Sequence, residues 1–274
     1  MKKFLLTTVA LAVAGWGCAE IQPLEGTNVV GFAAITAPGG VNTIITVPFE
    51  ACLESGAAGM LSDLVATNGL TSHATSEGDA DQLVVLTTNG ATQVYYYYWN
   101  KTGFGWTEIT SEMLMPDGSS QAVTPPAATN FPVARGLGFW IKRKTSGVST
   151  VYVKGQVSSE KQATTISEGL NLIGYGGLES VALNAIDWTG AYGINGISAT
   201  TDRILVGNGD GTYTTYFYYV KKAGSSSYYD QFTNLWVKST SSGPALPSSS
   251  LPVGQGFWYH RRGTGDFTFR PDGL

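Results

Sequence analysis

Charged side chains are scarce in this chain, and their scarcity limits what it can bind. Asp, Glu, Lys and Arg make up 13% of the 274 residues, against roughly a quarter in an average soluble domain. The formal net charge is −4, and loss of Lys2 and Lys3 with a signal peptide would make it −6. Nucleic-acid binding depends on clusters of Lys and Arg that neutralise phosphates. The charge balance therefore argues against a nucleic-acid partner.

Histidine and cysteine are almost as rare. The two histidines, His73 and His260, do not fall in a metal-ligand spacing such as His-Glu-x-x-His, so neither a metal nor a cofactor is expected. Of the two cysteines, Cys52 is expected to be a small buried apolar side chain, and a disulfide is conceivable only if Cys18 stays in the mature chain. No Gly-x-Ser-x-Gly elbow or phosphate-binding loop is present. We assign no catalytic residue and expect that the protein is not an enzyme.

Long hydrophobic runs are missing except at the N-terminus. Lys2 and Lys3 precede an apolar run over residues 4–14 and then small residues, which is the pattern of a secretory signal peptide and too short to span a bilayer. We expect a signal peptide over residues 1–19, with cleavage after Ala19 preferred to cleavage after Ala14. A lipoprotein anchored through Cys18 fits less well, because no aliphatic residue stands three positions before it. The sequence predicts a secreted or cell-surface protein with no transmembrane segment in the mature chain.

The chain contains an internal duplication. Residues 81–98 align without gaps with residues 202–219, at an offset of 121. A second block recurs at an offset of 118, where Gly138, Phe139 and Trp140 match Gly256, Phe257 and Trp258. Two weaker matches set Asn42-Thr-Ile44 against Asn171-Leu-Ile173, and Val30-Gly31 against Lys154-Gly155. Because repeats of this length are the size of a domain, we expect a first β repeat domain over residues 20–154 and a second over residues 155–274.

The local pattern of both copies is β. Asn89-Gly90 and Asp210-Gly211 each separate two β-rich runs, and such pairs favour a type I′ hairpin turn in which both central residues have positive φ. Other strands are expected at 27–35, 42–47, 138–142, 150–154, 171–174, 256–261 and 267–270. Residues 49–66 and 178–188 could each form a short helix. The sequence therefore predicts an all-β protein of two tandem, homologous, β-sandwich or barrel-like domains, each with one short helix possible.

Aromatic runs are the most conspicuous feature of the two hairpins. Residues 95–99 and 216–219 are all Tyr, Phe or Trp, and alternation along a strand places them on both faces of the sheet. One face can belong to the core. The other is either covered by a loop or the neighbouring repeat, or exposed as a ladder that binds a partner or stacks on sugar rings. The candidate ligand-binding residues are Tyr96, Tyr98 and Tyr219, and Phe217, which aligns with Tyr96, is not among them.

The Gly-x-Gly-Phe-Trp blocks have a structural interpretation. Their glycines allow a bend or bulge, and the tryptophan packs over the space they leave. Arg143 and Arg261 follow on the same strands, where they either cap the tryptophan through a cation–π contact or lie exposed. Residues 169–174 and 251–259 resemble the "NLI…P" and "GxGFW" or "GxGYW" blocks of uncharacterised secreted bacterial surface proteins. That resemblance implies an extracellular β-rich module without catalytic residues, although residues 40–48 of the first repeat depart from the pattern.

Several carboxylates lie near the expected strands and are candidate sites. Asp79 with Asp81, or Asp202 with Asp210, could in principle form the acid pair of a glycosidase. Asp81 and Asp202 occupy equivalent positions before a strand, where aspartate more often closes a turn by bonding its own backbone. Asn208 and Asp210 offer hard oxygen ligands for calcium, but the spacing of an EF-hand is absent. We therefore predict no metal site.

The expected function is structural. We expect a secreted, non-catalytic structural or surface-assembly protein that acts through strand edges and aromatic faces, as a filament or matrix subunit, with itself or other envelope proteins as partners. The strand at 27–35 either completes its own domain or pairs with the strand at 267–270 of another subunit, which would give head-to-tail filaments. The alternative is a carbohydrate-binding protein with a polysaccharide as its partner.

Overall fold

The computed structural model describes nine segments of the chain. They are residues 30–49, 70–72, 79–86, 92–100, 103–108, 135–157, 162–194, 196–248 and 250–271, with 92–100 and 103–108 described by their backbone. The expected signal peptide, both cysteines, His73, the Asn89-Gly90 turn and nearly all of the helix expected at 49–66 lie outside these segments.

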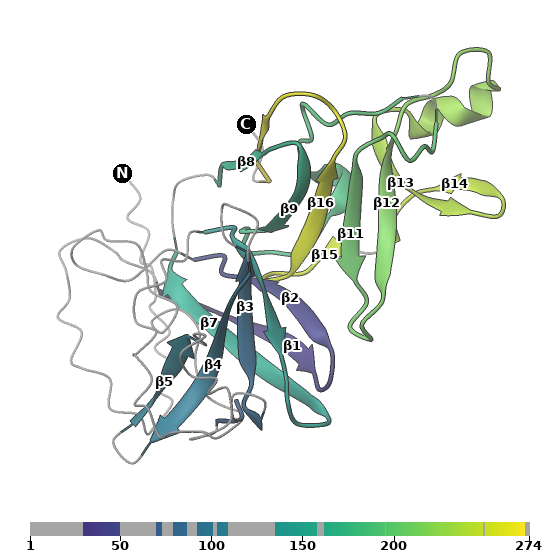
Figure 1. The fold of residues 1–274 in the computed structure, drawn as a ribbon. Coiled ribbons are helices and arrows are strands. Elements are labelled where there is room, and N and C mark those ends of the chain that lie inside the picture. The colour runs from purple at the N-terminus through teal and green to yellow at the C-terminus, as the bar shows by residue number, and fades with distance from the viewer. Residues whose placement is uncertain are drawn as a thin grey trace, which may run out of the picture.

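The described residues form an all-β protein, as the sequence predicts (Figure 1). All the strand pairs are antiparallel, and the helical elements of the described segments are two short 3₁₀ helices, η3 (Leu183–Ala185) and η4 (Ser227–Phe232). The helix expected at 178–188 is wrong, because β10 (Val181–Ala182) and η3 occupy that range. The Ala182 side chain cannot cap a helix, and Leu183, Ile186 and Trp188 are instead drawn into the core.

The duplication predicted from the sequence is confirmed by the order of the strands. The first sheet has the order β2-β6-β3-β4-β5, and the second has the order β14-β13-β12-β11-β16-β9. Strands β2, β6, β3, β4 and β5 thus correspond to β9, β16, β11, β12 and β13, with β14 added at the edge of the second sheet. The bounds are β2 (Asn42–Thr46), β3 (Gln82–Leu86), β4 (Thr92–Asn100), β5 (Gly103–Glu108), β6 (Gly138–Lys142), β9 (Gly169–Gly174), β11 (Arg203–Gly207), β12 (Tyr213–Tyr219), β13 (Leu235–Thr240), β14 (Gly243–Ala245) and β16 (Gly256–Arg261).

The pairing register tests each sequence match. Leu83 lies opposite Tyr95 in the first hairpin, and Ile204 lies opposite Tyr216 in the second, which confirms the offset of 121. The match at β2 is wrong by one residue. Ile45 and Ile173 lie opposite Phe139 and Phe257 respectively, so Asn42 corresponds to Leu170 and not to Asn171. A slip of one residue exchanges the two faces of a strand, and short apolar runs do not fix the register by themselves.

The match of Val30-Gly31 with Lys154-Gly155 is also wrong. Gly31 and Gly155 are cross-strand partners, because β1 (Val30–Pro38) pairs with β7 (Val148–Gln156) over nine residue pairs. Both strands have the same alternating pattern, which is why they resemble each other. Since β7 continues to Gln156, it ends two residues beyond the expected domain boundary.

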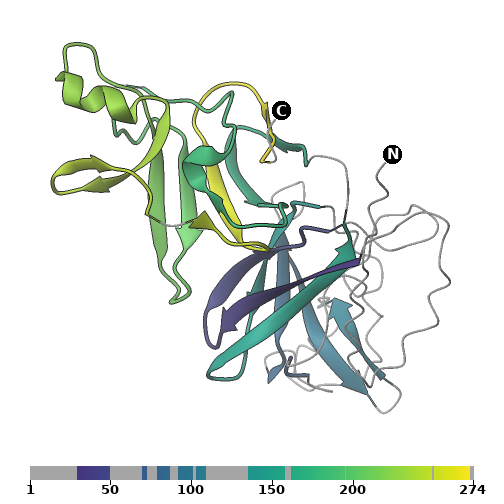
Figure 2. The ribbon, with the colours of Figure 1, turned by 180° about the vertical axis from the view of Figure 1, so that it is seen from behind.

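The strand expected at 27–35 could either complete its own domain or pair with another subunit. In the structure β1 pairs with β7 of the same repeat, so it completes its own domain. In the second repeat the corresponding ribbon consists of β8 (Thr164–Ile166) and β17 (Phe267–Phe269), so the C-terminal strand is also paired within the chain. Figure 2 shows β1 and β7 side by side across the first repeat.

Each repeat has its own core. In the first, the inner faces of β2, β3 and β6 pack on the inner face of the β1–β7 ribbon, and the fully buried residues include Ile45, Leu83, Phe139 and Val151. In the second, β9, β11, β12, β13 and β16 enclose an aromatic core. Its members include Trp188, Tyr216, Trp236, Phe257, Tyr259 and Phe269. A third cluster of Tyr219, Phe232 and Val237 covers the opposite face of β12 and β13.

The hairpin turn at Asp210-Gly211 differs from the type I′ turn expected. Five residues link β11 to β12, and positive φ occurs at Gly209 (81°) and Gly211 (87°) but not at Asp210. The Asp210 carboxylate accepts hydrogen bonds from the backbone N–H and the hydroxyl of Thr212 at 2.9 and 2.6 Å. This side-chain contact closes the loop and makes a two-residue turn unnecessary.

Candidate binding surfaces

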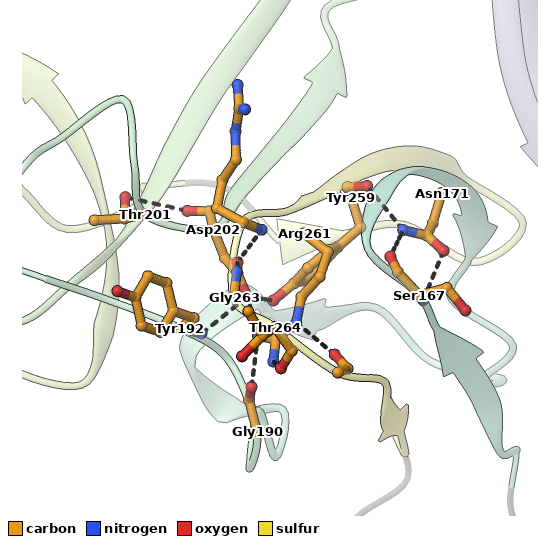
Figure 3. A network of polar contacts seen from close by, with 12 residues as sticks. Ser167, Asn171, Gly190, Tyr192, Thr201, Asp202, Tyr259, Arg261, Gly263 and Thr264 are labelled. Carbon is orange, nitrogen blue, oxygen red and sulfur yellow. Dashed lines mark hydrogen bonds and ion pairs between the residues drawn. The ribbon is translucent and has the colours of Figure 1, made fainter.

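A buried aspartate organises the second repeat (Figure 3). Asp202 is 0% exposed and precedes β11. One carboxylate oxygen accepts from the backbone N–H of Tyr192 (2.8 Å), the Tyr259 hydroxyl (2.6 Å) and Nη1 of Arg261 (2.7 Å). The other accepts from the backbone N–H groups of Arg262 (2.6 Å) and Gly263 (3.2 Å). Asp202 therefore ties the segment ten residues before it to the turn that follows β16.

The first repeat has the same arrangement in simpler form. Asp81 is fully buried and accepts from the backbone N–H groups of Thr71 (2.7 Å) and Lys144 (2.6 Å), and it forms an ion pair with Nε of Arg143 (2.8 Å). The position of Tyr259 is taken by Ile141, which has no hydroxyl to donate. The expectation that each aspartate closes a turn by bonding its own backbone is wrong. The N–H groups that Asp81 and Asp202 bind lie ten residues before them and about sixty after them, so each aspartate links segments that are distant in the sequence.

The two arginines are placed differently from either expectation. The sequence allows Arg143 and Arg261 either to lie exposed or to cap a tryptophan, and both expectations are wrong. Both arginines are buried, and they form ion pairs with Asp81 and Asp202 respectively. The guanidinium of Arg261 lies 5.1 Å from the centre of the Phe267 ring. A buried charge requires a partner of opposite sign, and the sequence shows this pair only as two residues about sixty positions apart.

This network does not present a reacting group at the surface. Burial, together with the charge of Asp202, raises the pKa of Tyr259 far above its usual value of about 10. Asp202 is sealed from solvent, whereas Asp210 lies in an exposed loop and is held by Thr212, so the two do not form an acid pair. Within the described residues no three His, Cys, Asp or Glu side chains come together.

The two repeats join through a reciprocal exchange of hydrogen bonds. The Thr46 N–H donates to the carbonyl of Gly254, and the Gly174 N–H donates to the carbonyl of Gly136, both at 2.8 Å. Gly254 and Gly136 have φ of 76° and 80°, a conformation that glycine adopts without strain. The first glycine of each Gly-x-Gly-Phe-Trp block thus bends the chain so that each repeat bonds to the outer strand of the other.

The second glycine of each block allows close contact. A Cβ on Gly138 would lie 2.9 Å from the carbonyl oxygen of Ile173, and a Cβ on Gly256 would collide with Ile44. Next to these glycines the rings of Trp140 and Trp258 meet edge to face, with centroids 5.2 Å apart. The tryptophans therefore pack on each other across the joint, in equivalent surroundings.

Of the three aromatic residues expected to bind a ligand, the structure describes the side chain of Tyr219. Tyr219 is 5% exposed and packs edge to face on Phe232 of η4 at 6.2 Å, so it cannot stack on a ligand in this structure. A loop covers the second aromatic face of β12, which is one of the two alternatives that the sequence allows. Tyr96 and Tyr98 lie on β4, whose side chains are outside the described part of the structure.

His260 lies on the outer face of β16 and is partly exposed. Burial, with the nearby charges of Arg262 and Arg203, lowers its pKa. Its counterpart in the first repeat, Lys142, is exposed, in keeping with the tolerant surface position expected from the sequence.

Sequence reasoning missed a cleft between the repeats. Its volume is about 360 Å³, within the range of roughly 300–1,000 Å³ typical of small-ligand pockets. One wall is the β1–β2 hairpin of the first repeat, and the other is the β11–β12 loop with residues 252–256 of the second. The polar side chains in its lining are Thr36, Asn42, Thr43, Asn208, Thr212, Tyr213 and Gln255. No single repeat contains it, so no motif in either copy signals it.

The outer face of the β1–β7 ribbon is the second exposed feature. Phe32 and Val148 are 69% and 70% exposed, and Val30 and Tyr152 are also exposed. The one charged residue that this face carries is Lys154, opposite Phe32. Neither β1 nor β7 has a further strand partner in the described segments.

Comparison with protein-family models, curated proteins and solved structures finds no match. None of the helices in the described segments is long and apolar enough to cross a membrane.

Proposed function

We propose that the protein is a secreted, non-catalytic assembly protein whose copies associate through the β1–β7 ribbon. The observation that carries the proposal is the apolar outer face of this ribbon, on which Phe32 and Val148 are largely exposed. Isolated apolar residues are normal on a protein surface. On this face, however, Val30, Phe32 and Ala34 follow one another along β1 and Tyr152 lies opposite Ala34, and neighbouring exposed apolar side chains more often mark an interaction site.

A second copy of the chain is the partner that this surface favours. Each strand of the ribbon has no further strand partner within the described segments, and about every second of its nine residues points its N–H and C=O groups outward. Unpaired edges invite the addition of another strand. The face carries a single charge, Lys154, so a second copy would meet little like-charge repulsion there.

The joint between the repeats supports a role in assembly. The reciprocal hydrogen bonds and the contact of Trp140 with Trp258 hold two similar domains at one relative orientation. A subunit with a fixed shape passes its geometry on to a polymer, whereas two freely hinged domains would not. The secreted location rests on the N-terminal pattern, and the resemblance to surface-protein modules agrees with it.

The experiment measures the oligomeric state of residues 20–274 by analytical ultracentrifugation and negative-stain microscopy. We expect oligomers or filaments, and we expect Phe32→Glu to disperse them, because it puts a charge into the apolar contact. Leu246→Glu is the matched control, since Leu246 is exposed but lies beyond β14, away from the ribbon. A wild-type protein that stays monomeric at every soluble concentration, or a Phe32→Glu variant that assembles normally, would contradict the proposal.

A separate measurement tests the location. In a Gram-negative host we expect the exported protein to begin at Glu20, as determined by intact mass. A protein that keeps residues 1–19 and stays in the cytoplasm would refute the expected signal peptide.

A further inference from the structure

We infer that the cleft between the repeats is a binding site for a neutral saccharide, in addition to the assembly role. Its two walls come from the two repeats and meet only because the repeats are locked together. The β1–β2 hairpin contributes Thr36, Asn42 and Ile44, and the second repeat contributes Asn208, Tyr213 and Gln255, among others.

The lining excludes charged ligands. None of its residues is Asp, Glu, Lys, Arg or His. A carboxylate, phosphate or ammonium group that entered this cleft would lose water without gaining an opposite charge, which is costly. Hydroxyl and amide side chains, in contrast, both donate and accept hydrogen bonds, as do the hydroxyl groups of a sugar.

The apolar part of the lining suits the other side of a sugar ring. Pro38, Ile44, Pro252 and Val253 stand beside the polar groups, and Tyr213 is partly exposed at the cleft. Ligand sites typically combine an apolar lining with a few polar groups that fix orientation. The Thr43 hydroxyl, also in this wall, is buried and has no hydrogen-bond partner in the described structure.

The pseudo-symmetry of the repeats provides an independent argument. The positions that correspond to Asn42, Gly207 and Gln255 are Leu170, Leu86 and Leu137, according to the strand pairing and the bridges Ile45–Gln255 and Ile173–Leu137. The cleft side of the joint therefore carries Asn42, Gly207 and Gln255 where the equivalent positions are leucines, of which Leu170 is itself 57% exposed. The bonds from Thr46 to Gly254 and from Gly174 to Gly136 recur on both sides of the joint. The Gln255 amide also donates to the Gly207 carbonyl at 3.3 Å, which holds this side chain at the cleft. Asn42 takes no part in these bonds and is exposed in the cleft wall, where it can meet a ligand.

The loop that forms the far wall is built to hold its shape. The side-chain Nδ2 of Asn208 donates to the Thr212 hydroxyl at 2.9 Å, and the Thr214 hydroxyl donates to the side-chain Oδ1 of Asn208 at 2.8 Å. With the Asp210–Thr212 contacts, these bonds fix the loop without a ligand. A preformed site avoids the entropic cost of ordering a loop on binding.

The test titrates residues 20–274 with a panel of neutral oligosaccharides (gluco-, manno- and xylo-oligomers) by isothermal titration calorimetry, with oligogalacturonate as the anionic counterpart. We expect at least one neutral oligomer to bind and oligogalacturonate not to bind. Asn42→Leu and Gln255→Leu introduce the residues of the opposite side, and each should weaken binding at least about tenfold. Of the two substitutions, Asn42→Leu should disturb the fold less, because Asn42 is exposed.

Two controls separate this site from the others. Tyr228→Ala removes an exposed aromatic ring on η4, outside the cleft, and should leave binding unchanged. Phe32→Glu should also leave it unchanged, so a failure of assembly and a failure of saccharide binding are distinguishable. Failure of every neutral oligomer to bind would overturn the inference, as would an affinity that Asn42→Leu and Gln255→Leu leave intact. Loss of binding in Tyr98→Ala alone would also overturn the inference and assign the site to β4.

Discussion

Removal of the Asp202 carboxylate should destabilise the protein more than any other single truncation of a polar side chain in the second repeat. The carboxylate accepts five hydrogen bonds, and one of them is an ion pair with Arg261. In Asp202→Ala the guanidinium of Arg261 keeps its buried position but loses the one anionic partner that it has among the described residues. The Tyr259 hydroxyl and three backbone N–H groups lose their acceptor at the same time.

The size of the loss follows from these contacts. Breaking a buried ion pair by removing one partner costs about 3–5 kcal/mol. A buried N–H group without an acceptor adds about 1–3 kcal/mol where water does not replace the carboxylate. We therefore expect the free energy of unfolding to fall by at least about 4 kcal/mol, a large share of the roughly 5–15 kcal/mol that stabilises a typical domain. Asp202→Asn keeps the volume and some hydrogen bonds, and should lose less.

Urea unfolding followed by tryptophan fluorescence measures this loss, because Trp188 and Trp236 lie in the same core. Asp210→Ala is the matched control. Its carboxylate is exposed, and in the described part of the chain it accepts hydrogen bonds from Thr212 of the same loop, so we expect an unfolding curve close to that of the wild type. A fall of less than about 1 kcal/mol for Asp202→Ala, or an equal fall for Asp210→Ala, would refute the central role given to this network.

Two further substitutions test the alkaline limit of stability and the joint. The pKa of Tyr259 is raised in the folded protein, so above pH ~10 only the unfolded chain loses this proton, and stability should fall by about 1.4 kcal/mol per pH unit. Tyr259→Phe should remove this contribution to the pH dependence of the free energy of unfolding, measured by urea unfolding between pH ~9 and ~11. If the free energies of the two proteins fall in parallel over this range, the prediction is wrong. A Cβ on Gly174 would collide with Thr46, so Gly174→Ala should cost about 1–3 kcal/mol and loosen the joint, measured as faster proteolysis between the repeats. In Gly207→Ala the nearest contact of the new Cβ would be 3.9 Å away, so no loss of stability is expected, and an equal loss in both variants would show that close approach is not the cause.

The hairpins were predictable because their signal is local. The gap-free alignment of residues 81–98 with residues 202–219 identifies the equivalent residues of the two hairpins, and the strand pairing agrees with it. The cross-strand register differs by one residue from that of the two-residue turn expected at Asp210-Gly211, because Val206 lies opposite Thr214 and not Thr215. Short apolar runs did not identify the equivalent strands of the two repeats correctly. The sequence match at β2 is wrong by one residue. The match of β1 with β7 interprets two strands that pair with each other as two copies of one strand. The alternation that makes strands recognisable is the same in every half-buried strand, so it does not identify the partner.

The buried charges were predictable only in part. The sequence shows that Asp81 and Asp202 are equivalent and that Arg143 and Arg261 are equivalent, but it does not show that each aspartate meets its arginine. The pairing of β11 with β16 brings them together. A covariation between the two positions, visible across related sequences, is the signal that would have found the pair.

The sequence by itself determined that the chain is a duplicated β protein, because strand periodicity, turn residues and recurrence at a fixed offset are written along the chain. Only the tertiary structure decided what the copies do to each other: which glycines allow the sheets to touch, that Trp140 and Trp258 pack together, and that a polar cleft opens on one side of the joint. These features depend on side chains more than a hundred residues apart, and their distance in space is set by the packing of two cores rather than by any local preference.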